Sequence, residues 1–382
     1  MKEIKGIVAG TIFTPKEELN NVLIEFDRDY IVDMRPFNGK IPENFLDAMH
    51  MIVIPGFIDI HIHGIEGVDV TRDGYDGIKK MSKILPKYGV TSFMPTAICS
   101  SKDTLRNFIL ASRKLWSEKI EGAEVIGAHL EGPFINPKRK GAQPIEHIRK
   151  PDTNELQDYI NAKGEMPLRL TIAPEIEGAI ELINEAIKNN IIISMGHSDA
   201  TFNEAEKGFK AGSHLITHLF NAMREFHHRE PGLSGFALNN DNVYTEIIAD
   251  FIHLHPEVLK LITRIKPLNK IILVTDAIEA AGLTDGTYQL GPYTITVKNR
   301  KATLPDGTIA GSTLTLDNAV RNITKLGLLL RFSIMMATST PAEVLKLENI
   351  GKIKIGMKAN LVILDHELNI KYTIIHGKIF KP

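Results

Sequence analysis

The stretch PGFIDIHIHG, residues 55–64, decides how the chain is interpreted, because it has the composition of a buried β-strand and yet carries three polar side chains in register. Side chains alternate faces along a strand, so Asp59, His61 and His63 share one face while the isoleucines between them share the other. In a parallel β/α barrel the isoleucines would pack on helices and the polar set would point inward, where barrel active sites form. A His-x-His pair in that position can bring two imidazoles to one metal ion.

The same rhythm continues along the chain, where apolar, β-branched runs end in polar or small residues and alternate with amphipathic, helix-like stretches. Eight such runs occur, at residues 57–63, 90–96, 124–132, 168–175, 191–199, 213–221, 244–250 and 270–277. Eight strands that alternate with helices over about 250 residues predict an α/β fold, a (β/α)8 TIM-type barrel. A doubly wound open sheet is the alternative, but no GxGxxG follows the first strand to support it.

The two chain ends have a different pattern, with short β runs separated by turn residues. The simplest interpretation is one small β domain formed by both ends, residues 1–54 and 346–382. The (β/α)8 metal-dependent hydrolase barrel, residues 55–345, is then inserted between the two parts. Residues 287–310, with Pro-Asp-Gly at 305–307, predict a hairpin excursion late in the barrel.

Composition argues against several functions. Lys plus Arg number 45 against 46 for Asp plus Glu, and this net charge of −1 leaves no footprint for nucleic acid or for an anionic membrane. A single cysteine, Cys99, rules out an intrachain disulfide and argues against zinc fingers and iron–sulfur clusters. The first residues lack the apolar core of a signal peptide, and no apolar run has the length of a membrane span. We therefore expect a cytoplasmic protein that binds neither nucleic acid nor membrane.

Further metal-ligand candidates close other predicted strands. Glu131 ends one of them, His197 and His218 end two more, and Asp276 ends the last. The carboxyl ends of barrel strands meet at one face, so these side chains are expected to lie near the His-x-His pair. A mixed nitrogen and oxygen ligand set with open positions is typical of a hydrolytic divalent ion and not of a closed structural site.

Several motifs, taken in order, resemble a known family. They are HLEGPFINPKRKGA (129–142), GHSDAT (196–201), THLFNAM (217–223), HHREPGLSG (227–235), VTDAIEAAG (274–282) and AGSTLTLDNAVRN (310–322). Together with PGFIDIHIHG they resemble the amidohydrolase superfamily and, within it, the family of N-acetylglucosamine-6-phosphate deacetylases. The resemblance covers essentially the whole chain, and the six later motifs are more specific than the first.

The resemblance implies a metal site built on a shared carboxylate. Glu131, His197 and His218 match the ligands of the main ion, and the intact pair His61 and His63 can hold a second ion. Glu131 then bridges the two ions, in place of the carboxylated lysine of other amidohydrolases. The expected cofactor is one or two divalent ions, with Zn²⁺ as the first choice and Fe²⁺, Mn²⁺ or Co²⁺ as alternatives.

The expected reaction follows from the same resemblance and from the chemistry of amides. Asp276 matches the catalytic aspartate, and a carboxylate beside an activated water can accept its proton and return it to the amine leaving group. A divalent ion lowers the pKa of that water and stabilises the developing oxyanion. The resemblance thus implies hydrolysis of the N-acetyl amide of N-acetyl-D-glucosamine 6-phosphate to D-glucosamine 6-phosphate and acetate, in amino-sugar metabolism.

The substrate, a small sugar phosphate, needs a local cation in a protein of nearly zero net charge. Arg229 matches the residue that binds phosphate in the family, and its guanidinium can contact phosphate oxygens in a bidentate fork. In the family this residue reaches the neighbouring subunit's site, which implies a homodimer. The other residues that match substrate contacts are Ala142, Gln143, Asn221, Ala222, His253, Ile309, Ala310 and Gly311.

Gln143 departs from the family pattern, which has a histidine that contacts the acetyl group at this position. Its amide can donate a hydrogen bond but cannot become cationic. Three alternatives stay open: a deacetylase of N-acetylgalactosamine 6-phosphate, another amidohydrolase such as one acting on a cyclic amide, and an inactive barrel with a structural role. The sequence separates neither the two epimers nor one bound ion from two.

Overall fold

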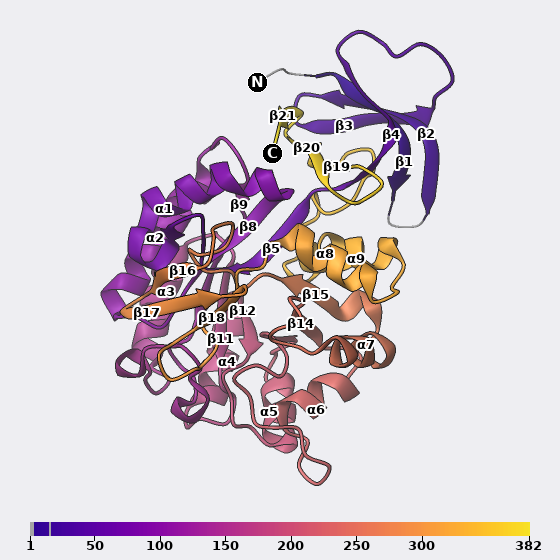
Figure 1. Cartoon of the computed structure of the whole chain (residues 1–382). Helices are drawn as coiled ribbons and strands as arrows, with labels where there is room; N and C mark the ends of the chain where they lie inside the picture. Colours follow the sequence, from indigo (N-terminus) through magenta and orange to yellow (C-terminus); the bar gives the residue numbers. More distant parts are fainter. Residues whose placement is uncertain (1–3, 15–16) are drawn as a thin grey trace.

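The computed structural model describes residues 4–14 and 17–382, and its centre is a parallel sheet that closes into a barrel (Figure 1). The barrel strands are neighbours in chain order: β5 (Phe57–Ile62), β8 (Val90–Ala97), β10 (Ala128–Glu131), β11 (Leu168–Ile172), β12 (Ile191–Met195), β13 (Leu215–Ile216), β14 (Tyr244–Ile248) and β15 (Ile271–Val274). The last strand meets the first through a bridge between Ile62 and Ala277, and the N–H of Asp276 donates to the carbonyl of His61 at 2.9 Å. The predicted (β/α)8 barrel is therefore confirmed.

Helices connect the strands and cover the barrel's outer face. They are α1 (Val70–Ile84), α2 (Lys102–Ser117), α3 (Thr153–Lys163), α4 (Ala179–Lys188), α5 (Phe202–Lys210), α6 (Gly232–Asn239), α7 (Pro256–Ile265), α8 (Leu316–Lys325), α9 (Leu330–Met336) and α10 (Ser339–Val344). The local sequence determines where several of these helices begin. Ser101 caps α2 by accepting the N–H of Thr104, and Thr201 forms a capping box with Glu204 at the start of α5.

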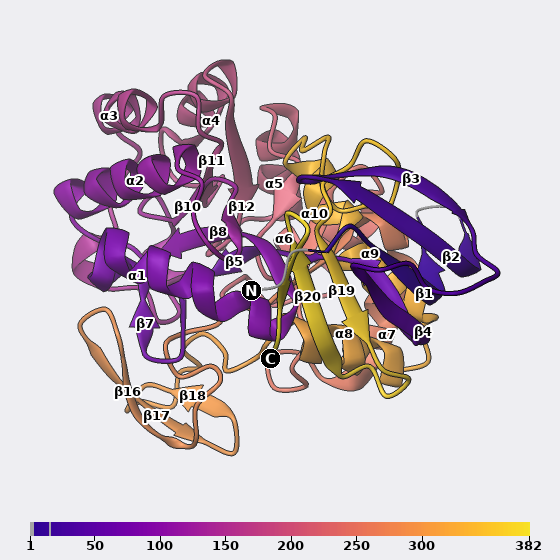
Figure 2. The same cartoon turned by 90° about the horizontal axis from the view of Figure 1, so that it is seen from above.

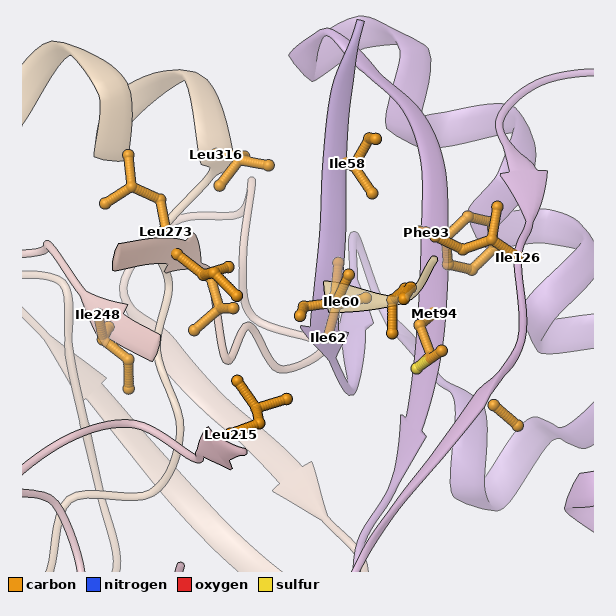
Figure 3. Packing of buried hydrophobic residues seen from close by; sticks show 14 of the residues in the cluster. Ile58, Ile60, Ile62, Phe93, Met94, Ile126, Leu215, Ile248, Leu273 and Leu316 are labelled. Atoms are coloured by element: carbon orange, nitrogen blue, oxygen red, sulfur yellow. The ribbon is translucent and has the colours of Figure 1, made fainter. Parts of the chain in front are cut away.

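The alternation along β5 separates an apolar face from a polar one, as the sequence predicts. Ile58, Ile60 and Ile62 are buried in the main core, and Figure 3 shows them in the same cluster as Phe93 of β8 and Leu316 of α8. Burying one such side chain contributes roughly 1.5–3 kcal/mol. A shift of one residue would move the histidines into this core, so burial of the isoleucines fixes which way His61 and His63 face.

Both chain ends contribute to a second, seven-stranded sheet beside the barrel (Figures 1 and 2). Its order is β21 (Lys378–Phe380), β20 (Ile370–Ile375), β19 (Leu361–Leu364), β4 (Phe45–Pro55), β1 (Gly6–Phe13), β2 (Glu18–Asp27) and β3 (Tyr30–Pro36). This sheet has its own apolar core and confirms a small β domain formed by both chain ends. The boundaries at 54/55 and 345/346 stay a prediction, and residues 1–3 and 15–16 of that domain lie outside the described residues.

The excursion predicted at 287–310 is larger than a hairpin. It is a three-stranded antiparallel sheet of β16 (Gly286–Leu290), β17 (Tyr293–Lys298) and β18 (Lys301–Thr303), which Figure 2 shows well apart from the seven-stranded sheet. A third apolar cluster joins this sheet to the barrel, with Leu290 and Ile295 packed near Ile98 and Ile278. Short elements complete the fold: β6 (Gly64–Ile65), β7 (Val68–Asp69), β9 (Glu124–Val125) and the 3-10 turns at Leu85–Tyr88, Pro137–Arg139, Ile145–His147 and Leu268–Lys270. None of the helices in the described residues is long and apolar enough to cross a membrane.

Candidate metal centre and active site

Glu131, the last residue of β10, lies at the centre of a buried cluster of histidines. Its Oε1 is 2.8 Å from Nε2 of His218, 3.1 Å from Nε2 of His197 and 3.3 Å from Nε2 of His61. Its Oε2 is 3.2 Å from Nε2 of His63. The five side chains come from four different strand ends, so the barrel brings together in space ligands that are far apart in the sequence.

Asp276 completes the cluster on the side of the His-x-His pair. Its Oδ1 lies 3.0 Å from Nε2 of His63 and 3.4 Å from Nε2 of His61. Two sets of donors can each surround one ion. One set is His61, His63, Glu131 and Asp276, and the other is Glu131, His197 and His218. Glu131 belongs to both, which is the arrangement that a bridging carboxylate needs.

Hydrogen bonds at Nδ1 orient two of the imidazoles so that their Nε2 atoms face the centre of the cluster. Nδ1 of His63 lies 2.9 Å from the carbonyl of Thr96, and Nδ1 of His197 lies 3.0 Å from the carbonyl of Arg139. A carbonyl can only accept, so in both rings Nδ1 carries a proton, and Nε2 is the nitrogen left to face a metal ion. Such contacts fix the tautomer that a metal ligand requires.

The donor set fits a divalent cation. Nε2 of His197 and Nε2 of His218 are only 3.1 Å apart and both face Oε1 of Glu131, so one ion at that point is within reach of all three atoms. Nε2 of His61 is buried and, among the described residues, has no hydrogen-bond partner. Buried polar atoms almost always have a partner, and an ion beside Glu131 would provide it.

The pKa shifts within the cluster also favour a bound cation. Burial lowers the pKa of His61, but the charges of Glu131 and Asp276 outweigh it and raise the pKa to about 9. Burial also lowers the pKa of His63, and the same two carboxylates raise it to about 10. Burial raises the pKa of Glu131, yet the neighbouring imidazoles hold it well below its usual range. The carboxylates therefore favour positive charge between them, and a divalent cation competes with protons for the same nitrogens.

Three members of the cluster have an uncommon backbone conformation. His197, His218 and Asp276 have φ of 48°, 30° and 50°, in the left-handed region that side chains with a Cβ seldom adopt. Each follows its strand by two residues, because β12, β13 and β15 end earlier than the apolar runs in the sequence suggest. The turn aims the side chain across the barrel mouth, and such strain is typical of functional positions.

A pocket of about 270 Å³ opens directly over the cluster. Most of the predicted site residues line it: His63, Glu131, Ala142, Gln143, His197, His218, Asn221, Ala222, His253, Asp276, Ile309 and Gly311. Four further residues line it without having been predicted: Ile98, Gly141, Leu290 and Thr308. Leu290 comes from the three-stranded sheet, so this excursion forms part of the wall.

Three predicted site residues lie outside the pocket wall. His61 is fully buried beneath it, with its ring in the ligand cluster. Ala310 is buried between the pocket residues Ile309 and Gly311, and its N–H donates to the carbonyl of Ala302 at 3.1 Å. Arg229 is exposed on the loop after β13, where its Nη1 lies 3.0 Å from Nε2 of His228. One copy of the chain thus leaves Arg229 away from its own pocket.

Glu246, the carboxylate that contacts Nδ1 of His61, was not identified from the sequence. Oε2 of Glu246, on β14, lies 3.2 Å from Nδ1 of His61 and accepts the N–H of His218 at 3.3 Å. Burial raises the pKa of Glu246, but the guanidinium of Arg169 and the imidazole of His61 lower it to about 2. Arg169 is itself fully buried and also donates to Thr217 Oγ1 at 3.0 Å. The one available signal was a glutamate within the apolar run YTEIIAD.

His129 and Asp59 share the inward faces of their strands but belong to neither of the two donor sets. Nε2 of His129 lies 2.7 Å from Thr171 Oγ1, and burial holds the pKa of His129 well below its usual range, so the ring is neutral. Asp59 accepts the hydroxyl of Thr275 at 2.6 Å and thereby ties β5 to β15. Both side chains support the barrel beneath the ligand cluster.

Comparison with known proteins places the chain among hydrolases of this type. Residues 52–380 match the amidohydrolase family. An N-acetylglucosamine-6-phosphate deacetylase of Bacillus subtilis is 40% identical, covering 86% of this chain and 84% of the relative. One of Lysinibacillus sphaericus is 37% identical over 92% and 94%. An N-acetylgalactosamine-6-phosphate deacetylase of Escherichia coli is 34% identical over 89% and 90%.

Two solved structures share the fold over nearly their full lengths. The N-acetylglucosamine-6-phosphate deacetylase of Thermotoga maritima superposes with a TM-score of 0.88 at 35% identity, covering 100% of this chain and 99% of that one. A variant of the Mycobacterium smegmatis deacetylase, in complex with N-acetyl-D-glucosamine 6-phosphate, superposes with a TM-score of 0.91 at 29% identity and covers 99% of both chains. The resemblance of the sequence motifs is therefore confirmed over the whole chain.

Proposed function

The chain belongs to the amidohydrolase family, and from this premise we propose that it hydrolyses the N-acetyl amide of N-acetyl-D-glucosamine 6-phosphate to D-glucosamine 6-phosphate and acetate. The observation that carries the proposal is the assembly of Glu131, His197, His218 and Asp276 at the floor of an open pocket. Relatives with the same fold carry this activity in their names, and one was solved with the sugar phosphate. The reaction belongs to amino-sugar metabolism.

The cofactor is a divalent metal ion held by the Glu131 cluster. In this proposal Glu131, His197 and His218 would hold the main ion, and His61 and His63 would hold a second ion together with Glu131. Zn²⁺ is the first choice because neutral imidazoles and carboxylates suit it, and Fe²⁺, Mn²⁺ and Co²⁺ accept the same donors. When bound, the ion acts as a Lewis acid that polarises the acetyl carbonyl and makes water nucleophilic at neutral pH.

Asp276 carries the proton in this proposal. It lines the pocket with only 7% of its surface exposed, and burial raises its pKa while the charge of His61 and the hydrogen bond from His63 lower it below its usual value. Its carboxylate takes a proton from the attacking water as the new C–O bond forms. The same proton then passes to the sugar nitrogen as the C–N bond breaks, so the amine leaves in a neutral form.

The remaining pocket residues suit the sugar phosphate. Asn221 and His253 offer polar side chains, and Nδ1 of His253 lies 2.7 Å from Asp250 Oδ2. Burial lowers the pKa of His253, but Asp250 outweighs it and raises the pKa. None of the lining residues in the described part of the chain is Lys or Arg, so the phosphate lacks a permanent cation within this wall. This supports the proposal of a homodimer in which Arg229 reaches the neighbouring site.

Arg229→Ala is expected to lower kcat/KM for the phosphorylated sugar by an amount consistent with a charge-assisted contact, about 1.5–3 kcal/mol. The loss should appear in KM, and the poor rate on unphosphorylated N-acetylglucosamine should stay unchanged. Lys140→Ala is the matched comparison, because it removes a cation that lies next to the pocket of its own chain. Nζ of Lys140 donates to the carbonyl of the pocket residue Gly141 at 3.1 Å. Equal losses on both sugars would mean that Arg229 is structural.

Mixing two impaired variants, assayed at a substrate concentration well below the native KM so that Arg229→Ala is slow as well, tests whether Arg229 acts across the dimer. A mixed dimer of Arg229→Ala and Asp276→Asn subunits has one site with both native residues if Arg229 acts on its neighbour, and none if it acts within its own subunit. Random exchange should then restore roughly a quarter of native activity, since half of the dimers are mixed and each has one intact site. No recovery from a preparation shown to contain mixed dimers would contradict the proposal.

The galacto epimer is the second candidate substrate, because an N-acetylgalactosamine-6-phosphate deacetylase is also among the relatives. Acetate release from the two epimeric 6-phosphates, measured side by side on metal-loaded protein, separates them. We expect the higher kcat/KM for the gluco epimer. A higher value for the galacto epimer would reassign the substrate, and no acetate from either would refute the proposed function. A cytoplasmic location remains part of the proposal.

A further inference from the structure

Gln143 lies against the ligand cluster, and both ends of its amide are hydrogen-bonded. Its Oε1 accepts the N–H of Cys99 at 2.7 Å, and its Nε2 donates to Oε2 of Glu131 at 2.5 Å. The orientation of the amide is dictated by its neighbours. A backbone N–H can only donate, so the atom facing Cys99 is the oxygen, and Nε2 is left facing the carboxylate. Gln143 and Glu131 are both buried, with 4% and 3% of their surfaces exposed.

The two oxygens of Glu131 therefore have different surroundings. Oε1 faces Nε2 of His218 at 2.8 Å, Nε2 of His197 at 3.1 Å and, less closely, Nε2 of His61 at 3.3 Å. Oε2 faces Nε2 of His63 at 3.2 Å and also accepts the hydrogen of Gln143. One lone pair of Oε2 is thus used by a neutral donor, whereas Oε1 faces only imidazoles. A hydrogen bond at one oxygen both fixes the carboxylate plane and reduces the electron density available to an ion at that oxygen.

From these contacts we infer that Gln143 is a positioning residue for Glu131, which makes the ion position at Glu131, His197 and His218 the tighter of the two. The inference rests on the metal site of the proposed function. It gives Gln143 a role other than the contact with the acetyl group that the sequence suggested.

The loop that carries Gln143 explains why the amide can do this. It follows β10, and the N–H of Gln143 donates to the carbonyl of Lys140 at 3.0 Å, which closes a turn. Cys99 follows β8, the strand beside β10 in the barrel. The amide therefore connects the end of one strand to the ligand at the end of the next. Without this hydrogen bond the carboxylate would be free to rotate. It would then lose orientational entropy when it binds an ion, and this loss weakens binding.

Gln143→Met tests the inference, because methionine keeps the length and removes both the donor and the acceptor. We expect the affinity of the tighter position for Zn²⁺ to fall 10- to 100-fold, the usual effect of removing a group that orients a metal ligand. The measurement is competition with a chromophoric chelator, starting from metal-stripped, substrate-free protein. Gln143→His should stay near the native affinity, since a neutral imidazole has one acceptor and one N–H donor. Gln157→Met, at an exposed position of α3, is the control for the same chemical change.

A second readout separates positioning from substrate binding. The loss of activity in Gln143→Met should shrink as added Zn²⁺ fills the site, whereas a lost substrate contact would leave KM raised by the same factor at any metal concentration. Native metal affinity in Gln143→Met, or equal losses in the Met and His variants, would overturn the inference. Gln143→Leu serves the same comparison if the Met variant does not fold. Because affinity is measured without substrate, an inactive protein would refute the proposed function and leave this result standing.

Discussion

Replacing Asp276 with asparagine is expected to lower kcat at least a hundredfold while the protein keeps its fold and its metal, the usual scale for loss of general acid–base catalysis. Asparagine has the shape of aspartate but cannot take a proton from water at neutral pH or return it to an amine. Oδ1 of Asp276 lies 3.0 Å from Nε2 of His63, so the carboxylate sits beside the ligand cluster. The measurements are kcat with N-acetyl-D-glucosamine 6-phosphate and metal content by mass spectrometry.

The matched control is Asp285→Asn, an identical change at an exposed aspartate in the loop before β16. It should leave both kcat and metal content at native values. If Asp276 served only as a metal ligand, Asp276→Asn would lose metal, and added Zn²⁺ would restore kcat. A variant that turns over near the native rate would remove Asp276 from the mechanism.

His218→Ala is expected to strip the main ion and to lower kcat/KM by at least a hundredfold, more than the 10–100-fold typical of groups that only support a ligand. Nε2 of His218 makes the closest approach of an imidazole to Glu131, at 2.8 Å. His63→Ala should be milder, because its Nε2 faces Oε2 of Glu131 and belongs to the second donor set. Metal equivalents per chain and activity are compared after dialysis against a chelator and after Zn²⁺ is restored.

His50→Ala provides the comparison outside the site, since His50 is exposed on β4 of the small sheet. It should bind metal as the native chain does. The order of effects also tests the assignment of the two positions. If His63→Ala loses more metal than His218→Ala, the main ion is held by the first strand and the proposed order is reversed.

The local periodicity of apolar and polar residues was enough to predict the barrel and to predict that His61 and His63 face its interior. Alternation in PGFIDIHIHG places the isoleucines in the core, and the burial of Ile58, Ile60 and Ile62 leaves His61 and His63 only one face to occupy. The eight apolar runs likewise located all eight barrel strands. Periodicity does not say which residues meet across the barrel, so the roles of individual residues came from family motifs.

Contacts between residues that lie far apart in the sequence were missed, because the alternation of polar and apolar residues along one strand does not encode them. Glu246 supports His61 although 185 positions separate them, and Arg169 reaches Glu246 across the barrel interior. The early end of β13 also escaped notice, because the apolar residues Leu219 and Phe220 follow soon after Ile216, while the backbone turns to a left-handed φ at His218. The orientation of the Gln143 amide depends on a backbone N–H from another loop, which no linear motif records.

The seven-stranded sheet has a consequence for how the chain is made. Strands β1 to β4 leave the ribosome before the barrel, but β4 gains its second neighbour, β19, only after the entire barrel has been synthesised. At about 5–20 residues per second, one edge of β4 stays without its partner for roughly tens of seconds. An unpaired edge can pair with another chain, so the nascent protein is most prone to aggregation in that interval. The strands made after the barrel therefore protect those made before it, and chaperones that cover strand edges should matter most for this chain before β19 emerges.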